Sequence, residues 1–527
     1  MYDKRDLRHR QVVVVGSGFG GALAAWPLVR SGLDVLMVER GPWIPRGPHC
    51  WAPEGTITRT PWYESDHYAP ARTDRGLQEV RSVSAVGGPS VFYGAVSMRF
   101  READFAGDPE IVGDSGASWP IGYPHLRPYY DEVERILRVA GEAGVDPTEP
   151  PRPDAYPAPL NALSEVSARM AAAARSLGLR PFRLPLAIDF GDSDGRRPCA
   201  QCDTCDTFAC AVEAKNDLAT TVLAELQRRG MEIRPETAVT RLHVEGTKVT
   251  GVACRDRKTG ETYAVTADTV VLAAGALGTP HLLLSSGLHE LCPAGDAVGR
   301  YLTRHCSGIV FGAYSWVLRH EGRFHKQIGI NDFYLGDPDG RGPKGKLGNI
   351  QQTQTPNIGT VVGETGPAVG ALLKPLVRRA TGLLVIAEDR PQHGNRVYLA
   401  ERATPDAPRA LAIEHHYDDR DLAARKRLYV RARQIHRAAG SPFTYTHTIN
   451  TFSHAMGTVR MGPDPERSPL DAAGRFRGAD NLYVTDGSAL PTSGGLNPSL
   501  TIAANALRIG SLLAQRVRTG AEAVAAR

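Results

Sequence analysis

The first forty residues predict a strand, a helix and a second strand from the order of their apolar and polar positions. Residues 12–15 are a β-branched apolar run, residues 22–30 have the composition of a helix, and residues 34–39 form a second apolar run. A glycine-rich stretch, GSGFGG, occupies residues 16–21 between the first strand and the helix. This pattern predicts a βαβ unit with a tight turn after its first strand.

Further along the chain, the apolar spacing changes between helix-like and strand-like. Residues 126–140, 160–177 and 216–229 have the apolar spacing and composition of helices. Residues 231–275 instead alternate apolar with polar positions and contain two glycine turns, which predicts a hairpin or meander that returns to a buried strand. We therefore predict an α/β fold.

The part of the chain between residues 305 and 450 has a different character. It contains short strand-like pieces, connections rich in glycine and proline, and one helix expected over residues 420–439. The last eighty residues are again dense in glycine, proline and small residues and end in a helix expected over residues 500–516. We interpret residues 305–450 as part of a second domain.

Composition limits the classes of partner and compartment. The chain has 527 residues, which predicts about two to four domains and a large buried core. Lysine and arginine number 62 against 57 aspartate and glutamate, a net charge of +5, and no basic block carries interleaved aromatic residues, so a nucleic-acid partner is not expected. No apolar run approaches the ~18 residues of a membrane helix and no leader peptide is recognisable, so we expect no membrane span and a cytoplasmic location.

The glycine turn has the spacing of a dinucleotide-binding site. Gly16, Gly18 and Gly21 satisfy G-x-G-x-x-G between a strand and a helix, and Glu39 ends the next strand. The glycines let the backbone approach a pyrophosphate, the start of the helix offers unpaired N–H groups, and a carboxylate can accept both ribose hydroxyls. The negative charge of Glu39 disfavours the 2′-phosphate of NADP, which leaves FAD and NAD.

Three further segments decide between these two cofactors. Residues 86–94 are a tight run of small residues, residues 269–277 form a buried strand ending in Ala-Gly-Ala, and residues 481–510 combine a strand, an acidic turn and a Gly-Pro-rich entry into a helix. In order and spacing, these segments are similar to those of the glucose-methanol-choline (GMC) oxidoreductase family over nearly the whole chain. Residues 118–139 look most like the branch that holds pyranose oxidases and sugar dehydrogenases.

The resemblance implies an α/β protein with FAD as its cofactor. A Rossmann-like FAD-binding domain is accompanied by a discontinuous second α+β substrate domain built on an antiparallel sheet. The FAD-binding domain is expected over residues 1–100, 190–304 and 451–527, and the substrate-binding domain over residues 101–189 and 305–450. Beside the dinucleotide residues, those implied at the cofactor are Gly87, Gly88, Ser90, Gly94, Val239, Ala274, Gly275, Asp486, Gly487, Asn497 and Pro498. Phe92 stands where some members attach the flavin through a histidine, so we expect non-covalent FAD.

The resemblance also implies which residues act on the substrate. Oxidation of an alcohol by a flavin requires a base for the hydroxyl proton and a geometry that directs the carbinol hydrogen to flavin N5 as a hydride. His454 lies in a segment similar to the family's H-x-x-G-T, and Asn497 stands where the family has its second catalytic residue, a histidine or asparagine. We predict His454 as the base and Asn497 as the partner that orients the hydroxyl. The alternative roles are a structural histidine in a glycine-rich turn and a cap of the last helix.

We therefore predict an FAD-dependent oxidoreductase that oxidises the CH–OH group of a sugar-like or other polar alcohol, with dioxygen or an electron carrier as acceptor. The substrate class rests on the subfamily resemblance alone. Three alternatives stay open: a flavin-containing lyase or decarboxylase on the same scaffold, an oxidase of steroid or long-chain alcohols, and an FAD-binding protein without catalytic activity.

Four of the eight cysteines lie close together in the sequence. They are Cys199, Cys202, Cys205 and Cys210, in the spacing C-x2-C-x2-C-x4-C. This spacing is close to that of iron–sulfur ligands and also suits zinc. Three interpretations stay open: a metal or iron–sulfur site, one or two disulfides, and free buried thiols. A cluster would imply a dehydrogenase that passes electrons to a carrier, whereas a chain without one could use dioxygen.

Overall fold

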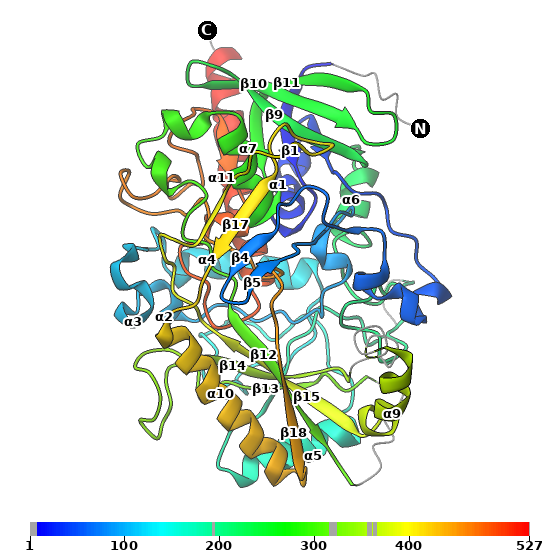
Figure 1. The fold of residues 1–527 in the computed structure, drawn as a ribbon. Coiled ribbons are helices and arrows are strands. Elements are labelled where there is room, and N and C mark those ends of the chain that lie inside the picture. Colours follow the sequence, from blue (N-terminus) through cyan, green and yellow to red (C-terminus); the bar gives the residue numbers. More distant parts are fainter. Residues whose placement is uncertain (1–7, 192–194, 316–323, 356–360, 362–365, 526–527) are drawn as a thin grey trace.

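The structure is a computed structural model that describes residues 8–191, 195–315, 324–355, 361 and 366–525. Two large sheets dominate it. Figure 1 shows a mainly parallel sheet in the upper half of the molecule and an antiparallel sheet in the lower half. A smaller sheet lies between them, so the molecule is organised around three sheets whose strands come from distant parts of the chain.

The upper sheet has seven strands, and its centre is parallel. The order is β8 (Glu232–Arg234), β2 (Val35–Val38), β1 (Arg10–Val15), β11 (Thr262–Leu272), β10 (Lys248–Asp256) and β9 (Thr237–Glu245), with β19 (Leu482–Val484) also beside β11. The pairs among β8, β2, β1, β11 and β19 are parallel, whereas β9, β10 and β11 form antiparallel hairpins. The apolar run over residues 12–14 is fully buried, as expected of a strand inside a covered parallel sheet.

Helices cover this sheet and bury its apolar side chains. They are α1 (Phe19–Arg30), α4 (Tyr123–Ile136), α6 (Val222–Arg228), α7 (Gly275–Ser285) and α11 (Ser499–Ala525). A Cβ at Gly510 of α11 would overlap the carbonyl oxygen of Ala24 in α1, so these two helices pack closely. The hydroxyl of Tyr130 in α4 lies 2.7 Å from Thr501 Oγ1 in α11. Among the described residues, no helix is long and apolar enough to cross a membrane.

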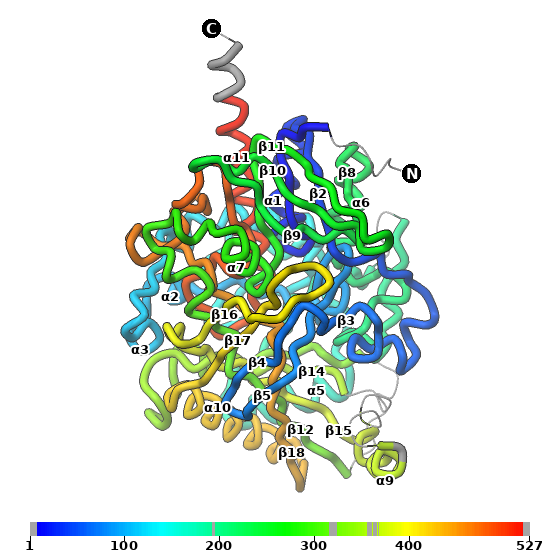
Figure 2. The backbone as a smooth tube through the Cα atoms, turned by 45° about the horizontal axis from the view of Figure 1, so that its top comes forward, coloured from blue at the N-terminus to red at the C-terminus, as the bar shows by residue number. Residues whose placement is uncertain are grey.

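The lower sheet has six strands and is antiparallel throughout. The order is β18 (Phe443–Thr448), β12 (Cys306–Ala313), β15 (Ala380–Ala387), β14 (Gly348–Thr353), β13 (Ile328–Ile330) and β7 (Phe182–Arg183). Two helices, α10 (Asp419–Ala438) and α5 (Glu165–Ser176), pack on it around a core separate from that of the upper sheet. Another helix, α9 (Pro367–Val377), lies at the lower edge of the molecule (Figure 2). The antiparallel sheet implied by the resemblance is confirmed.

The small sheet in the middle of the molecule joins parts of the chain that the sequence assigns to different domains. Its order is β16 (Arg396–Leu399), β17 (Leu411–His415), β4 (Ala71–Thr73) and β5 (Gly76–Gln78). The central pair, β17 with β4, is parallel. Nearby short elements are β3 (Tyr63–Glu64), β6 (Ser82–Val83), α2 (Glu102–Phe105) and α3 (Pro109–Val112). The division into two domains stays a prediction.

The predicted elements differ from the observed ones mainly at their ends. The strand, helix and strand expected at the start of the chain are present as β1, α1 and β2. The helix expected over residues 216–229 is wrong at its start, because α6 begins only at Val222. The side chain of Asn216 donates to a backbone carbonyl at 2.9 Å, and that of Asp217 accepts from a backbone N–H at 3.1 Å. These side-chain bonds compete with helical ones and hold both residues in a turn.

Replacing Gly510 with alanine tests the close packing of α1 and α11. Helix propensity favours alanine by about 1 kcal/mol, but a Cβ at this position overlaps backbone in α1, and overpacking costs about 1–3 kcal/mol. We expect the G510A substitution to lower the midpoint of thermal unfolding, measured by circular dichroism. The S511A substitution on the same helix is the control and should leave the midpoint nearly unchanged. A rise in the midpoint for G510A would contradict the packing described here.

Candidate active site

The predicted FAD-binding residues near the start of the chain gather around the glycine turn before α1. The carboxylate of Glu39 accepts a hydrogen bond from the backbone N–H of Ser17 at 3.0 Å and from the hydroxyl of Ser17 at 2.6 Å. That hydroxyl in turn accepts from the N–H of Gly87 at 2.9 Å. A Cβ at Gly88 would lie 3.0 Å from the Cα of Gly18. The two glycine segments therefore touch, and small residues make that approach possible.

Asp486 brings the last part of the chain to the same turn. Its carboxylate accepts a hydrogen bond from the N–H of Gly275 at 2.9 Å, and its backbone nitrogen lies 2.9 Å from where a Cβ of Gly20 would be. The next residue, Gly487, accepts at its carbonyl from the N–H of Gly457 at 3.1 Å. Three segments therefore meet at the start of α1, where unpaired N–H groups and the helix dipole attract a pyrophosphate.

The other residues implied at the cofactor lie in turns, in a strand and just before a helix, where their contacts mainly hold the backbone in place. The hydroxyl of Ser90 donates to a carbonyl three residues earlier at 2.7 Å and accepts from a backbone N–H at 3.1 Å, so it fixes the turn. Val239 lies in β9, whose first residue donates its N–H to the carbonyl of Glu39 at 2.9 Å. Ala274 lies in the turn from β11 to α7, and Pro498 is buried immediately before α11.

The two predicted catalytic segments are joined by a histidine that the sequence did not single out. His305 Nδ1 lies 3.0 Å from His454 Nδ1, and the two rings are edge to face. The other nitrogen of His305, Nε2, lies 2.8 Å from the carbonyl oxygen of Gly494, three residues before Asn497. A short antiparallel bridge holds the two histidine segments side by side. His305 thus links the predicted base to the loop that carries its predicted partner.

The partners of His305 determine where the protons lie. Carbonyl oxygens only accept, so Nε2 of His305 carries a hydrogen. Burial lowers the pKa of His305, so the ring is neutral and its Nδ1 accepts. The 3.0 Å contact then requires His454 to donate from Nδ1, which leaves the lone pair of His454 on Nε2. A neutral imidazole with one free lone pair is the form that a general base requires.

The charge state of His454 follows from its surroundings. Burial lowers its pKa to about 3, and His305 and the ammonium of Lys326 add to this effect. The negative charge of Asp389 acts in the opposite direction. His454 is therefore neutral near neutral pH, and Asp389 is the group that would stabilise a positive charge developing on it.

His305 is held in place by the buried carboxylate of Asp389. This carboxylate accepts from the backbone N–H of His305 at 3.1 Å and from the hydroxyl of Ser493 at 2.8 Å. His305 has a left-handed backbone, with φ of 62°, which a non-glycine residue adopts only when its surroundings hold it there. One carboxylate thus fixes the histidine and the loop that leads to Asn497.

Asn497 lies two residues before the start of α11, and one of its polar atoms has no partner among the described residues. Its Oδ1 is buried and has no hydrogen-bond partner in the described part of the chain, so the capping bond of the alternative interpretation is not formed. An unpaired buried group costs about 1–3 kcal/mol, which a bound molecule can recover. A Cβ at Gly18 would meet nothing within 4 Å, so there is open space at the start of α1. These features fit bound FAD.

Comparison with known proteins identifies the family. Residues 20–307 and 391–506 each match a family model described as GMC oxidoreductase. The chain belongs to the GMC oxidoreductase family. It is 34% identical to the 6'''-hydroxyparomomycin C oxidase of Streptomyces lividus, over 96% of this chain and 91% of the relative. It is 33% identical to the paromamine 6'-oxidase of Streptomyces fradiae, over 97% of this chain and 93% of the relative.

The solved structures agree with this assignment at the level of the fold. Pyridoxine 4-oxidase from Mesorbium loti aligns with a TM-score of 0.67 and 22% identity, over 97% of this GMC chain and 99% of that one. The predicted family and FAD as cofactor are confirmed, and the chain is an FAD-dependent oxidoreductase that acts on CH–OH groups. Because the relatives are named oxidases and dehydrogenases, the lyase or decarboxylase alternative is not favoured.

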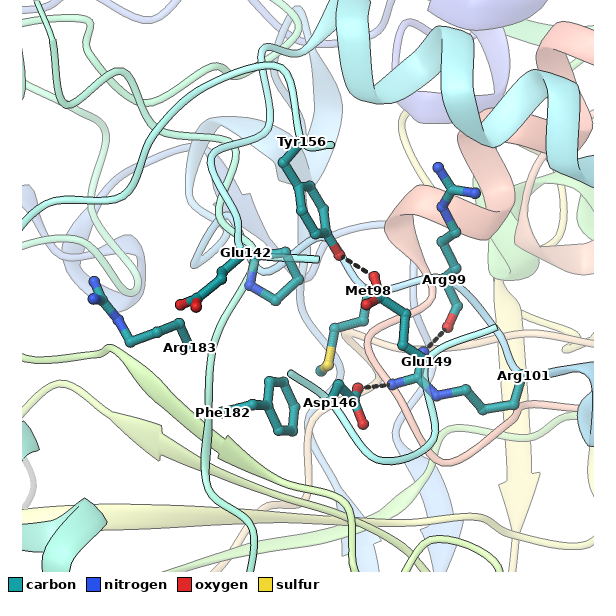
Figure 3. A pocket seen from close by; sticks show the side chains of 10 residues that line it. Met98, Arg99, Arg101, Glu142, Asp146, Glu149, Tyr156, Phe182 and Arg183 are labelled. Carbon is teal, nitrogen blue, oxygen red and sulfur yellow. Dashed lines mark hydrogen bonds and ion pairs between the residues drawn. The ribbon is translucent and has the colours of Figure 1, made fainter. Parts of the chain in front are cut away.

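A small charged recess in this GMC chain lies apart from the predicted catalytic residues. Figure 3 shows its lining, which includes neither His454 nor Asn497. Several of its polar groups are bonded to one another, as in the ion pair of Arg101 with Asp146 and the 2.9 Å bond from the hydroxyl of Tyr156 to a glutamate. We therefore assign it no part in the reaction.

The four clustered cysteines line one small cavity and are free thiols. Burial raises the pKa of Cys199 to about 12 and raises that of Cys205 well above its usual value, so both stay protonated. Across the described ranges, no three histidine, cysteine, aspartate or glutamate side chains are placed to hold a metal ion. The metal and disulfide interpretations of this GMC segment stay predictions.

Sequence reasoning missed His305 and Asp389, because no local motif marks either residue. Two weak signals were available. The predicted boundary between the FAD-binding domain and the substrate-binding domain falls between residues 304 and 305. Polar residues where the chain passes from one domain to the other lie at the interface between the two domains. Asp389 follows another acidic residue directly after an apolar strand, a position from which a carboxylate reaches the edge of a sheet.

The low pKa of His454 predicts a dependence of stability on pH. The folded chain keeps His454 neutral down to about pH 3, whereas the unfolded chain binds a proton near pH 6.5. Since the unfolded state binds more protons between these values, the free energy of unfolding falls as the pH drops below 6.5, by up to about 1.4 kcal/mol per pH unit. Urea unfolding at pH 5 and pH 7.5 should show a smaller loss for H454N than for the unmodified enzyme. The control H416N, at an exposed histidine, should retain the full loss.

Proposed function

We propose that this enzyme oxidises a polar, sugar-like alcohol and that His454 removes the proton of the reacting hydroxyl. The contact of 3.0 Å between Nδ1 of His305 and Nδ1 of His454 carries the proposal. Because of it, the lone pair of His454 lies on Nε2 without any prior change of protonation. The reaction then takes place between the upper and the lower sheet, where the loops of His454 and Asn497 meet.

In the proposed reaction, the substrate hydroxyl gives its proton to Nε2 of His454 while the carbinol carbon loses a hydride and becomes a carbonyl carbon. FAD, when bound, supplies the acceptor for that hydride. The bond from His454 to His305 keeps the imidazole from rotating. Behind His305, the carboxylate of Asp389 stabilises the positive charge that His454 gains.

We infer that Asn497 orients the reacting hydroxyl. The support is its buried Oδ1, which lacks a partner in the described residues and so is available to a ligand. A carboxamide presents both an acceptor and donors, and it can turn either toward a hydroxyl group. Asn497 would thus fix the hydroxyl oxygen while His454 takes the proton.

The lower sheet favours a polar substrate over a steroid or long-chain alcohol. Side chains alternate along β14, and Asn349, Gln351 and Thr353 share the face opposite to Ile350, which packs in the core of the lower sheet. Both polar side-chain atoms of Gln351 are buried without a partner in the described part of the chain. Hydroxyl groups of a sugar can satisfy them, whereas an apolar substrate cannot.

We infer that dioxygen accepts the electrons and that FAD is not covalently attached. Two relatives at 34% and 33% identity are named oxidases, which supports dioxygen as acceptor. Phe92 is buried, and its phenyl ring has no group that could bond to the flavin. The inferred enzyme would therefore release its FAD on unfolding and produce hydrogen peroxide during turnover.

Replacing His454 with alanine tests the proposed base. General base catalysis contributes about 10²- to 10⁴-fold to a rate. We therefore expect H454A to reduce its flavin more slowly by that factor when a sugar-like alcohol is added without oxygen, and to consume oxygen more slowly by the same factor. The variant should still contain FAD. The matched control is H416N, which should react as the unmodified enzyme does, because His416 is exposed and hydrogen-bonds Asp74 at 2.9 Å. Unchanged flavin reduction in H454A would refute the assignment.

Two substitutions at His305 test whether it positions His454. H305N retains an acceptor for His454 and suits the left-handed backbone, since asparagine adopts positive φ more readily than most residues. H305F removes both hydrogen bonds. We expect kcat to fall about tenfold or less in H305N and at least about 100-fold in H305F, with KM little changed. Equal losses in both variants, or a change confined to KM, would show that the bond to His454 does not matter for the reaction.

A further inference from the structure

An ion pair between Asp206 and Lys326 lies directly over the predicted flavin segment. A Cβ at Gly94 would overlap both Nζ of Lys326 and Oδ1 of Asp206. Asp206 belongs to the cysteine-rich segment, and Lys326 lies just before β13 of the lower sheet. The pair therefore joins three distant parts of the chain at one point. Lys326 is also one of the charges that lower the pKa of His454, which places the pair within electrostatic reach of the predicted base.

The accessible member of this pair is the carboxylate. The side chain of Asp206 is 23% exposed, whereas that of Lys326 is 5% exposed. Its Oδ2 accepts from the hydroxyl of Thr353 at 3.1 Å and from the N–H of Gln354 at 3.3 Å, and its Oδ1 faces Lys326. Each carboxylate oxygen accepts about two hydrogen bonds, so Oδ1 has a position left for a ligand.

Asp206 carries a negative charge despite its surroundings. Burial opposes its ionisation, but the ammonium of Lys326 and the bonds at Oδ2 outweigh that effect and hold the pKa of Asp206 below its usual range. Lys326, lying underneath, keeps the carboxylate charged and in a fixed position. The member of this pair that a ligand can reach is therefore an ionised carboxylate.

Gln351 lies on the same face of β14 as Thr353, about 7 Å away along the strand. Its side chain is almost completely buried, and neither Oε1 nor Nε2 has a partner in the residues described. An amide in this state costs free energy unless a ligand binds to it. The Thr353 hydroxyl donates to Asp206 at 3.1 Å and so connects this face of β14 to the carboxylate.

We propose that Asp206 and Gln351 form an amine-binding subsite, so that the substrate is an alcohol that also carries an ammonium group, such as an amino sugar. This inference rests on the proposed function, because it assumes that the oxidised alcohol lies along this face of β14. The ammonium group donates to Oδ1 of Asp206, and Oε1 of Gln351 accepts a second N–H. Nε2 of Gln351 remains to donate to a neighbouring hydroxyl.

A pair of probes that differ only in the group at C2, an ammonium or a hydroxyl, tests the subsite. These are methyl 2-amino-2-deoxyglucoside, an ammonium at neutral pH, and methyl glucoside, its neutral counterpart. We expect kcat/KM of the unmodified enzyme to be at least about tenfold higher for the amine, because a charge-assisted hydrogen bond is stronger than a neutral one. D206N should reduce this ratio to about one by raising KM for the amine, with little change in kcat/KM for the neutral glycoside.

Two further variants separate recognition from folding. D206N leaves a buried lysine without its partner, so its flavin content and unfolding midpoint are measured alongside its kinetics. Q351L removes an amide that has no partner in the described chain, so it should fold at least as well as the unmodified enzyme and lower the amine preference in the same direction. The control D203N removes one negative charge three residues earlier and should leave the ratio unchanged.

The outcomes distinguish this inference from the proposed function. A ratio near one in the unmodified enzyme overturns the subsite, as does an equal loss for both probes in D206N and Q351L, which would make the ion pair a structural clamp. Either result leaves the proposed oxidation intact as long as one glycoside reduces the FAD of the unmodified enzyme and does not reduce the FAD of H454A. If neither glycoside and no other alcohol reduces FAD, the proposed function fails and the inference fails with it.

Discussion

The position of the proposed catalytic groups depends on one buried carboxylate. Asp389 accepts from the backbone N–H groups of Arg304 at 2.8 Å and His305 at 3.1 Å and from the hydroxyl of Ser493 at 2.8 Å. A buried charge is tolerated only when such bonds replace its hydration. Here the bonds that stabilise the carboxylate are made by the segment of His305 and by the loop that leads to Asn497, which meet in the proposed active site. Because the buried carboxylate requires these bonds, it also fixes the geometry of the proposed active site.

A second set of buried charges holds the same loop from the other side. Glu388 accepts from the N–H of Gly494 at 3.1 Å, and the ammonium of Lys346 lies 2.8 Å from Glu388 and 2.9 Å from Asp104. A Cβ at Gly494 would lie 2.8 Å from the ring of Phe100, so no larger residue fits. The loop before Asn497 is therefore fixed by its backbone, whereas Oδ1 of Asn497 has no hydrogen-bond partner among the described residues.

The sequence was sufficient to predict features that depend on neighbouring residues in one segment. It was insufficient to predict features that depend on contacts between distant segments. The glycine turn, Glu39 and the segments of His454 and Asn497 are local motifs, so their family and their place in the fold were predictable. His305 was one of sixteen histidines, and only a bridge between segments about 150 residues apart reveals its role. The start of α6 was misplaced for the same reason, because the bond that holds Asn216 in a turn goes to a residue far away in the sequence.

The packing of α1 against α11 has a consequence for the order of events in the cell. A chain leaving the ribosome presents β1, α1 and β2 several hundred residues before the helix that covers α1 and the acidic turn at Asp486. Until then the glycine turn has no closed surroundings, and the apolar surface of α1 is exposed to chaperones and to aggregation. Loading of the cofactor therefore has to wait for these later segments, and loss of α11 would remove cofactor retention along with stability.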